Sequence, residues 1–588
     1  MKRALGVAAG MAAGLLALAP AGHAQDRGFL RAEGTRIVDS EGRPVLLRGM
    51  GLGGWMLQEG YMLDLGELEK GQQHVIRRHI AGAIGEKGAD RFYRAWLDNF
   101  ITKADIDAMA RWGFNSVRLP MHYNLFTLPV EKEPVAGRDT WIESGFERVD
   151  RLLEWTRANG MFLILDLHAA PGGQGNDLPI ADRDPSKPSL WDSAENRRKT
   201  VALWKRLAGR YADEPGIGAY DILNEPNWDF DGPVDGHGCK STKNAQLWDF
   251  YRELIAAIRS VDKRHMIVIE GNCWGNNYGG QEKPLDANLT LSFHKYWNRN
   301  DAASIAPYLA LRDRLGVPLW LGESGENSNV WFRDAIRLVE DQGIGWSWWP
   351  LKKIRYNNPL QVDANPGWDA LVAWWLGKGP KPDAKAAEAA LMRLAEHDVR
   401  FENNIFHPDV IDAMFRLPHA DEARPFKANH VGAEAFAIAA VDYDLGPAGI
   451  AYADREDANY YVATGGERVT WNSGLTYRND GVDVAREADG VPYVASFQTG
   501  EWMQYTLDLD RAGTRALTVT GRGRAGGTLS LSLNGGAPVT LTLLAGTGWQ
   551  TLRVPAVKML QGNNRLVLKA ENCADCEVKG LEVAAAGS

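Results

Sequence analysis

Two glutamates that follow short apolar runs are the strongest candidates for chemistry in this sequence. Glu225 stands in Asp221-Ile222-Leu223-Asn224-Glu225-Pro226, where proline stops an apolar run directly after Asn224 and Glu225. Glu323 ends a second run, Leu319-Trp320-Leu321-Gly322. One carboxyl group of a pair can protonate a glycosidic oxygen while the other attacks the sugar carbon or activates water. The pattern therefore predicts glycosidic bond cleavage if the fold brings the two side chains together.

Other interpretations of these residues stay open at this point. Either glutamate alone could be a solvated loop residue or half of a structural ion pair. A zinc or two-metal hydrolase would need clustered ligands, often as close histidine pairs. His168 and His294 are isolated in the sequence. We therefore predict no cofactor for catalysis.

Short apolar runs alternate with longer stretches of helical periodicity from residue 46 to residue 349. Repeated strand–helix order predicts a parallel sheet with helical crossovers, and eight units in about 300 residues predict an α/β (β/α)₈ TIM barrel. The predicted strands are 46–51, 116–119, 162–167, 218–223, 266–269, 289–293, 318–322 and 345–348, and the predicted helices include 146–159, 196–211, 245–261 and 330–341.

Polar and aromatic residues gather at one end of these predicted strands. In a TIM barrel the C-terminal ends of the strands carry the active site. The residues at or just past those ends are Arg118, His168, Asn224, Glu225, His294, Glu323 and Trp349.

Several short segments, in this order, resemble glycoside hydrolase family 5 over roughly residues 35–380. The segments are SVRLP with Arg118, LDLHAAPG with His168, ILNEPN with Asn224 and Glu225, SFHKYW with His294 and Tyr296, LGES with Glu323, and WSWWP with Trp349. The resemblance implies a retaining mechanism with Glu225 as acid/base and Glu323 as nucleophile.

The remaining residues of these segments are expected to bind substrate or support the carboxylates. Arg118 beside the nucleophile would keep it ionised, and Tyr296 could orient it. Asn224 would hydrogen-bond a hydroxyl next to the broken bond. Trp349 would form the floor under the sugar ring. His168 and His294 would bind hydroxyls or hold the acid/base, and Lys352 would reach a further subsite. Structural alternatives are a buried ion pair for Arg118 and satisfied core histidines. Glu326 is the second choice as nucleophile.

Long loops at the rim of the barrel limit the range of substrates that we expect. The loops 55–104 and 169–193 could wall a cleft into a pocket, and the segment DLHAAPGGQGND resembles the exo-acting β-glucan branch of the family. We therefore expect a β-linked polysaccharide or oligosaccharide of the β-glucan type as partner. β-Mannan, xyloglucan or another decorated glycan is the alternative, as are glycosyl transfer and a non-catalytic glycan-binding protein. Endo or exo action is left open.

The composition and the hydrophobic pattern change after residue 425, where short alternating runs rich in Gly, Thr and Val begin. The runs at 514–521, 528–533, 539–543, 551–554 and 565–569 predict an all-β, jelly-roll-like sandwich. The segments SFQTGEWMQYTLDL and GTGWQTLRVPAVKMLQGNNRLVL resemble a family 6 carbohydrate-binding module, which implies glycan binding and a candidate structural calcium. Tyr493, Trp502, Trp549 and the pair Tyr460-Tyr461 are the candidate glycan contacts; core positions are the alternative for Trp502 and Trp549.

The N-terminal residues predict export. Lys2 and Arg3 precede an apolar run from Ala4 to Ala19, and small residues end at Ala24, as in a secretory signal peptide. An uncleaved anchor is the alternative. Cys239 with Cys273 and Cys573 with Cys576 then read as disulfides of a secreted protein, periplasmic or extracellular. We expect no membrane span after cleavage.

Composition bounds the remaining choices. The 588 residues carry 66 Lys and Arg against 75 Asp and Glu, a net charge of −9, so no basic footprint for nucleic acid is present. An apolar content of 45% excludes disorder over the whole chain. We divide the chain into a signal peptide (1–24), a barrel domain (25–428) and a β-sandwich domain (429–588), and expect a monomer.

Overall fold

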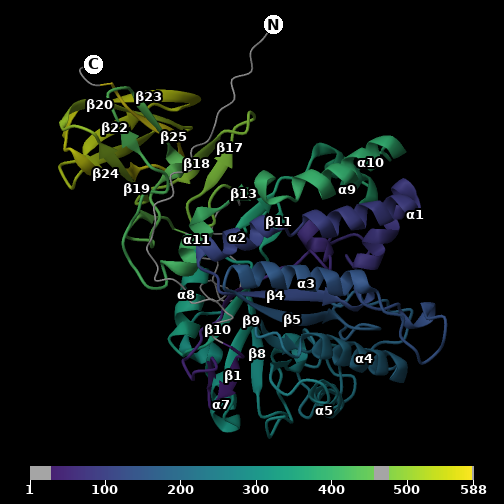
Figure 1. The fold of residues 1–588 in the computed structure, drawn as a ribbon. Coiled ribbons are helices and arrows are strands. Elements are labelled where there is room, and N and C mark those ends of the chain that lie inside the picture. Colours follow the sequence, from purple (N-terminus) through teal and green to yellow (C-terminus); the bar gives the residue numbers. More distant parts are fainter. Residues whose placement is uncertain (1–27, 456–475, 586–588) are drawn as a thin grey trace.

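The computed structural model describes residues 28–455 and 476–585, which form a barrel followed by a β-sandwich (Figure 1). The predicted signal peptide and the pair Tyr460-Tyr461 lie outside the described residues. None of the described helices is both long enough and apolar enough to cross a membrane.

The barrel is a closed ring of parallel strands in the order β10-β3-β4-β5-β6-β7-β8-β9. Each of the predicted runs is one of its strands, so the (β/α)₈ prediction is confirmed. Their bounds are β3 Arg48–Gly51, β4 Ser116–His122, β5 Phe162–Ala169, β6 Ile217–Asp221, β7 Met266–Glu270, β8 Leu289–Lys295, β9 Leu319–Gly325 and β10 Gly345–Trp349.

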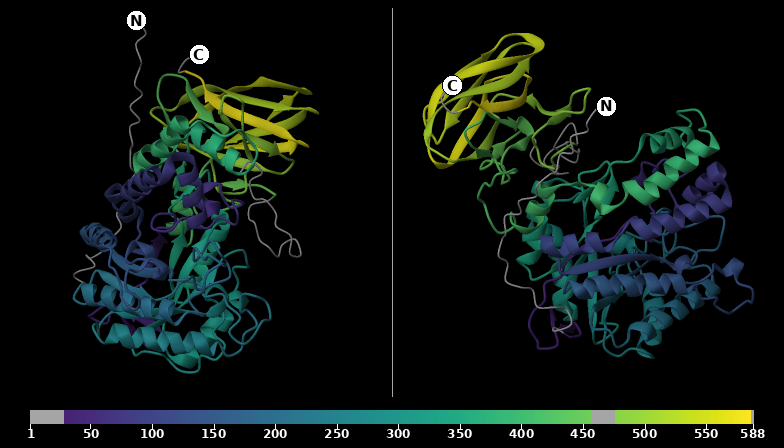
Figure 2. Two further views of the ribbon diagram at one scale, coloured as in Figure 1. Left: turned by 90° about the vertical axis from the view of Figure 1, so that its right-hand side faces the viewer. Right: turned by 45° about the horizontal axis from the view of Figure 1, so that its top comes forward.

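Helices wrap the ring on its outside (Figure 2). The longer helices bury apolar side chains; α8, for example, turns Val330, Ala335 and Val339 inward. Their bounds are α1 Gln73–Asn99, α2 Lys103–Trp112, α3 Glu143–Ala158, α4 Ala194–Tyr211, α5 Ala245–Arg259, α6 Asn272–Gly275, α7 Ala302–Leu315 and α8 Asn329–Glu340, followed by α9 Pro366–Trp375, α10 Ala384–Arg393 and α11 Pro408–Phe415. Short strands complete this part: β1 Arg31–Glu33, β2 Arg36–Val38, β11 Lys352–Ile354, β12 Leu360–Val362 and β13 Ile405–Phe406.

Strand alternation explains which side chains enter the barrel. Phe162 and Ile164 of β5 belong to an apolar cluster with Met266 and Val268 of β7 and with Leu30 ahead of β1. Residues two positions apart share a face, so Asp166 and His168 follow Ile164, and Glu270 follows Val268, on the same inner side. The barrel is therefore apolar toward the N-terminal ends of the strands and charged toward their C-terminal ends.

The C-terminal part consists of two six-stranded sheets, as the all-β prediction requires. One sheet runs β14-β19-β24-β21-β22 with β16 on β19, and the other β17-β18-β25-β20-β23 with β15 on β25. The bounds are β14 His430–Val431, β15 Phe436–Ala439, β16 Tyr452–Ala453, β17 Val484–Arg486, β18 Pro492–Phe497, β19 Trp502–Leu509, β20 Gly513–Gly523, β21 Gly527–Leu533, β22 Val539–Leu543, β23 Gly546–Met559, β24 Gly562–Asn572 and β25 Cys576–Val583.

One disulfide lies within each part, and hydrogen bonds connect the sandwich to the barrel. Both predicted disulfides are present, Cys239–Cys273 in the barrel and Cys573–Cys576 in the sandwich. Asn479 of the sandwich joins the barrel, since its amide nitrogen donates to Asp409 Oδ2 at 2.8 Å and its side chain donates to the carbonyl of Asn327 at 2.9 Å.

Candidate active site

The C-terminal ends of β4, β5, β6, β8 and β9 bring the predicted carboxylates and their partners into one buried cluster. The side chains that meet there are Arg118, His168, Asn224, Glu225, His294, Tyr296 and Glu323. Ligand-capable atoms of Glu225, His294 and Glu323 all lie within 4.8 Å of one another.

Arg118 is the cation at the centre of this cluster and is fully buried. It binds Glu323 Oε1, Asp221 Oδ2 at 2.9 Å, Asn224 Oδ1 at 2.8 Å and Glu270 Oε1 at 3.1 Å. The guanidinium presents its donors in a rigid fork, so it fixes several acceptors at once. One of these acceptors is the Glu323 carboxylate, which thus has a buried cation as its direct partner.

Glu225 is held in an unusual backbone conformation, with φ 42°. Its amide donates to Glu270 Oε2 at 2.7 Å, and its Oε1 lies 2.6 Å from His294 Nδ1. Burial raises the pKa of Glu225 to about 7, although the hydrogen bond from His294 opposes the rise. This carboxyl group therefore carries a proton below about pH 7.

Glu323 meets donors on both of its oxygens. Arg118 binds Oε1, and the Tyr296 hydroxyl donates to Oε2 at 3.0 Å. Gly322 beside it is required by close packing, because a Cβ there would lie 2.1 Å from Ser292 Oγ and 3.2 Å from His294 Nε2. The two glutamates thus stand close together in contrasting surroundings, one protonated near neutral pH and one paired with a cation.

His168 is a neutral partner in this site. Burial lowers its pKa to about 3. Its Nδ1 lies 2.7 Å from Asp166 Oδ2, and its Nε2 lies 3.2 Å from the Asn224 side-chain nitrogen. Gln174 donates to the carbonyls of both His168 and Asn224, at 2.7 and 2.8 Å, which fixes the ends of β5 and β6 relative to each other.

Trp349 lines the site as a buried wall. Its indole stacks on His168 with ring centroids 5.2 Å apart and planes 4° apart, and its Nε1 donates to the Tyr61 hydroxyl at 2.8 Å. Gly51 and Gly53 leave room for it, since a Cβ at either would come within 2.7 Å of the ring. The indole is only 4% exposed, so contact with a sugar stays a prediction.

The prediction that Lys352 reaches the site is wrong. Lys352 is fully buried away from it, where Nζ lies 2.7 Å from Asp105 Oδ1 and donates to the carbonyls of Phe100 and Val399. Lys353 points the other way along β11 and pairs with Glu326 Oε1 at 2.8 Å. Glu326 is therefore bound to a lysine outside the Arg118 cluster, and Glu323 alone of the two contacts that arginine.

Four buried carboxylates of this cluster were not predicted, namely Glu59, Asp166, Asp221 and Glu270. Glu270 ends β7, contacts Arg118, and lies 3.2 Å from His294 Nε2. Burial would raise the pKa of Glu270, but the charges of His294 and Arg118 outweigh it and lower that pKa. Glu59 lies 3.8 Å from His168 Nε2, and burial, followed by repulsion from Glu323 and Glu225, raises its pKa. Glu270 directly follows the predicted strand 266–269, so the strand-end rule could have found it.

The set Glu225, His294 and Glu323 has the donor types of a metal site. The 2.6 Å distance between His294 Nδ1 and Glu225 Oε1 is that of a hydrogen bond. Two ligands each ~2.0 Å from one tetrahedral ion would lie ~3.3 Å apart. The geometry therefore fits a shared proton between these two groups better than a shared ion.

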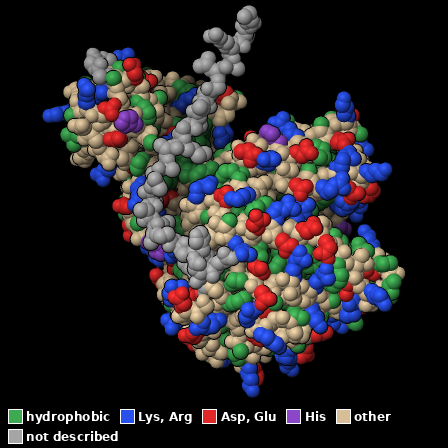
Figure 3. All heavy atoms as spheres, in the orientation of Figure 1, with side chains coloured by type: hydrophobic (Ala, Val, Ile, Leu, Met, Phe, Trp, Pro, Cys, Tyr) green, Lys and Arg blue, Asp and Glu red, His purple; other side chains and the backbone are tan. Residues whose placement is uncertain are grey.

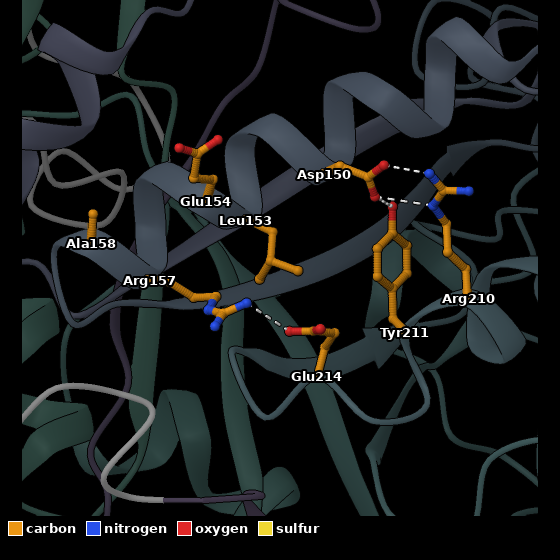
Figure 4. A pocket seen from close by; sticks show the side chains of 8 residues that line it. All are labelled: Asp150, Leu153, Glu154, Arg157, Ala158, Arg210, Tyr211 and Glu214. Carbon is orange, nitrogen blue, oxygen red and sulfur yellow. Dashed lines mark hydrogen bonds and ion pairs between the residues drawn. The ribbon is translucent and has the colours of Figure 1, made fainter.

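Two cavities lie away from this cluster. A cavity of about 600 Å³ between α3 and α4 is lined by charged groups that pair with one another (Figure 4). Arg157 binds Glu214 at 3.0 Å, and Tyr211 donates to Asp150 at 2.9 Å. A second cavity, of about 460 Å³, lies behind the 170–193 loop, where Asp182 joins His74 and His122. In both cavities these acidic groups are engaged with neighbouring basic or hydroxyl side chains.

The aromatic residues predicted to bind glycan on the sandwich are engaged with protein groups. Arg522 lies over the Trp549 ring at 4.1 Å and the Tyr493 ring at 5.1 Å, and Trp549 Nε1 donates to Glu487 at 2.9 Å. Trp502 is half-buried at the start of β19. Among the sandwich residues that the structure describes, no three metal-ligating side chains converge, and calcium stays a prediction.

Comparison with known proteins agrees with this geometry. Residues 78–353 match the Cellulase family, glycosyl hydrolase family 5. This match covers a little under half of the chain and supports a glycosyl hydrolase family 5 domain in the barrel. The protein is a glycoside hydrolase. A family 6 carbohydrate-binding module in the sandwich stays a prediction.

Curated proteins named as glycosidases or glucanases are similar to about half of this chain or more. A beta-xylosidase of Phanerodontia chrysosporium is 27% identical over 387 residues, 60% of this chain and 76% of its own length. A probable glucan 1,3-beta-glucosidase A of Emericella nidulans is 27% identical over 53% of this chain and 72% of its own. Endoglucanase C of Acetivibrio thermocellus is 24% identical over 45% and 88%. A solved structure of endogalactoceramidase covers 92% of this chain and 99% of its own at 17% identity, with a TM-score of 0.40.

Proposed function

We propose that this protein is an exported, retaining β-glycosidase that acts on glycans of the β-glucan type. The observation that carries the mechanism is the pairing of Glu225 and Glu323, with carboxylate oxygens within 4.8 Å of each other. Retaining enzymes hold their carboxyl groups about 5–5.5 Å apart, whereas inverting enzymes leave about 6.5–9.5 Å for a water molecule.

The residues suit two successive displacements. The Glu323 carboxylate attacks the anomeric carbon while the Glu225 proton moves to the departing oxygen, so the glycosidic bond breaks and a glycosyl ester forms. Water then attacks the same carbon, gives a proton to Glu225 and releases Glu323. The pKa of about 7 at Glu225 suits a group that first gives and then takes a proton.

Exo action on short β-linked chains is the form of this activity that we favour. Relatives named glucan 1,3-beta-glucosidase and beta-xylosidase, together with the long rim loops, support it. Because the relative spanning 60% of this chain is named a beta-xylosidase, β-xylosides are the second candidate substrate. The signal-like N-terminus and two disulfides support export.

The test is hydrolysis of a panel of 4-nitrophenyl β-glycosides, β-linked oligosaccharides and β-glucan, mannan, xylan and xyloglucan polymers, with Glu323→Gln as control. We expect release from β-glucosides and β-glucan oligosaccharides, with the β-anomer formed first by NMR. Faster release from β-xylosides would favour the second candidate. Initial formation of the α-anomer, or release that persists in the variant, would contradict the mechanism.

A further inference from the structure

Arg478 and Asn479 of the sandwich contact the barrel on the side that carries the predicted nucleophile. The Asn479 side chain donates to the Asn327 carbonyl at 2.9 Å and to Asn329 Oδ1 at 3.1 Å. All three asparagines are 5% exposed or less, so water is largely excluded from these hydrogen bonds. Asn329 begins α8, and α8 and α11 lie on the side of the barrel nearest the sandwich in Figure 1.

The backbone of Asn479 completes the N-terminus of α8. The first amides of a helix have no partner within the helix and need one from elsewhere. The amide of Asn329 donates to the Asn479 carbonyl at 2.7 Å, and the amide of Trp331 donates to Ser328 Oγ at 3.2 Å. One of the groups that cap α8 therefore belongs to the sandwich.

The loop between Glu323 and α8 is short and is held at two points. Glu326 has a φ of 53°, a left-handed conformation that a non-glycine residue keeps only where its surroundings hold it. Its Oε1 accepts from Lys353 Nζ at 2.8 Å. The Asn327 carbonyl, four residues after Glu323, accepts from Asn479. Because the packed residues between them have little room to adjust, a shift of Asn327 would also move Glu323.

A second hydrogen bond from the same sandwich segment reaches the strand that carries Lys353. Asn357 Nδ2 donates to the Arg478 carbonyl at 2.8 Å, and Asn357 follows directly on β11, which contains Lys353. The sandwich thus contacts the segments that carry both members of the ion pair between Lys353 and Glu326.

The N-terminus of α8 also supports the loop that carries Tyr296. Trp331 Nε1 donates to the Asn298 carbonyl at 2.8 Å, and Asn300 Nδ2 donates to the Trp331 carbonyl at 3.0 Å. Tyr296, at the start of this loop, donates to Glu323 Oε2 at 3.0 Å. The position of α8 therefore affects Glu323 along the chain and also through its hydroxyl donor.

We propose that the Arg478-Asn479 segment of the sandwich is a positioning element of the active site, which holds the loop between β9 and α8 so that Glu323 is oriented for attack. This role rests on the proposed retaining mechanism and gives the sandwich a part in catalysis that requires no glycan bound to it. A misplacement of about 1 Å can cost about 10²-fold in rate, so a partial loss of these restraints should be measurable.

The test is Asn479→Ala in the full-length protein, with Asn429→Ala as the matched control. Asn429 is also buried, at 6% exposed, but its Nδ2 donates within the sandwich, to the Thr506 carbonyl at 3.0 Å. Both are assayed on the best substrate of the panel, at a temperature where circular dichroism shows them folded. We expect kcat of Asn479→Ala to fall at least about fivefold with KM within about twofold, and both constants of the control to stay within about twofold of the wild type.

A 2-deoxy-2-fluoro glycosyl fluoride of the same sugar isolates the attack by Glu323, because fluoride departs without a proton from Glu225. Its inactivation rate constant should fall in Asn479→Ala by about the same factor as kcat and stay within about twofold in the control. Asn357→Ala removes only the hydrogen bond to the Arg478 carbonyl, and we expect a loss of about threefold in the same constant.

A kcat and an inactivation rate constant within about twofold of the wild type in Asn479→Ala would overturn the proposal. Equal losses in Asn479→Ala and Asn429→Ala would also overturn it, since they would reflect general stability. If Asn479→Ala does not fold, an unchanged inactivation rate constant in Asn357→Ala has the same meaning. A wild-type enzyme that is inactive on every glycoside of the panel and is not inactivated would instead overturn the proposed function.

Discussion

The barrel end and the sandwich both combine aromatic with charged side chains, but they differ in how fully acidic groups are paired with cations. On the sandwich, Arg522 lies over Trp549 and pairs with Glu487 and Glu577, so charge and ring face are satisfied internally. At the barrel end, the carboxyl groups outnumber the cations Arg118 and His294; they are Glu59, Asp166, Asp221, Glu225, Glu270 and Glu323. Strongly perturbed groups of this kind mark sites selected for function rather than stability.

On the surface, as within the sandwich, acidic and basic side chains lie close to one another. On the face shown in Figure 3, basic and acidic side chains are interspersed over both parts of the molecule. The concentration of like charge is therefore a feature of the buried barrel end. Four experiments test this difference between the two regions.

Glu323→Gln should have the largest effect. The amide cannot form the glycosyl ester, so we expect kcat to fall at least about 10⁴-fold while the fold is kept. Glu326→Gln is the matched control three residues away, since its carboxylate binds Lys353 instead of Arg118. A variant of Glu326 that loses as much activity as that of Glu323 would reverse the assignment.

Arg118→Gln should follow, because it affects both activity and stability. The change leaves Asp166, Asp221 and Glu270 buried without their cation, which costs about 3–5 kcal/mol of unfolding free energy. Denaturant unfolding measures this cost, and kcat should fall by about 10³-fold. Arg48→Gln removes a half-exposed partner of Glu340 on the same barrel and should cost less than about 1 kcal/mol. Equal costs for the two variants would contradict the special role of Arg118.

The third experiment follows the pH dependence of kcat/KM. Glu225 must be protonated to act as acid, so activity should decline as pH rises through about 7. Cationic His294 favours the ionised form of Glu225, and His294→Asn should therefore raise the pKa of Glu225. The alkaline limb should move to higher pH while the maximum rate falls by about 10²-fold. A limb that stays in place would show that another group sets it.

Much of this site could be predicted because parallel strands of a barrel end at one rim. That rule and the resemblance to family 5 together indicated Arg118, His168, Glu225, His294 and Glu323. Glu59 could not be, since it lies in a loop before α1 and reaches His168 only through tertiary folding. The prediction for Lys352 was wrong because all three residues of β11 are buried. Without alternation between buried and exposed positions, the sequence does not show which side of the strand each residue faces. Glycan contact by Trp549 stays a prediction, and its pairing with Arg522 could not be foreseen because Arg522 lies on another strand.

The smallest effect on catalysis is expected in the sandwich. Trp549→Ala removes the packing of Arg522 and Tyr493, which should lower the unfolding free energy by about 1–2 kcal/mol. Activity on soluble oligosaccharides should stay within about twofold of the wild type. Retention on insoluble β-glucan, measured by co-sedimentation, should also be unchanged. If the variant no longer binds insoluble β-glucan but is as stable as the wild type, Trp549 is a glycan contact. The sandwich would then carry a binding site of its own.

The proposed mechanism requires Glu323 to form a covalent bond to the sugar. The most direct measurement is incubation with a 2-deoxy-2-fluoro β-glucosyl fluoride, which slows the second displacement, followed by peptide mass spectrometry of the inactivated enzyme. We predict one glycosyl adduct, on Glu323. An adduct on Glu225 or Glu326, or turnover with inversion and no adduct, would contradict the account.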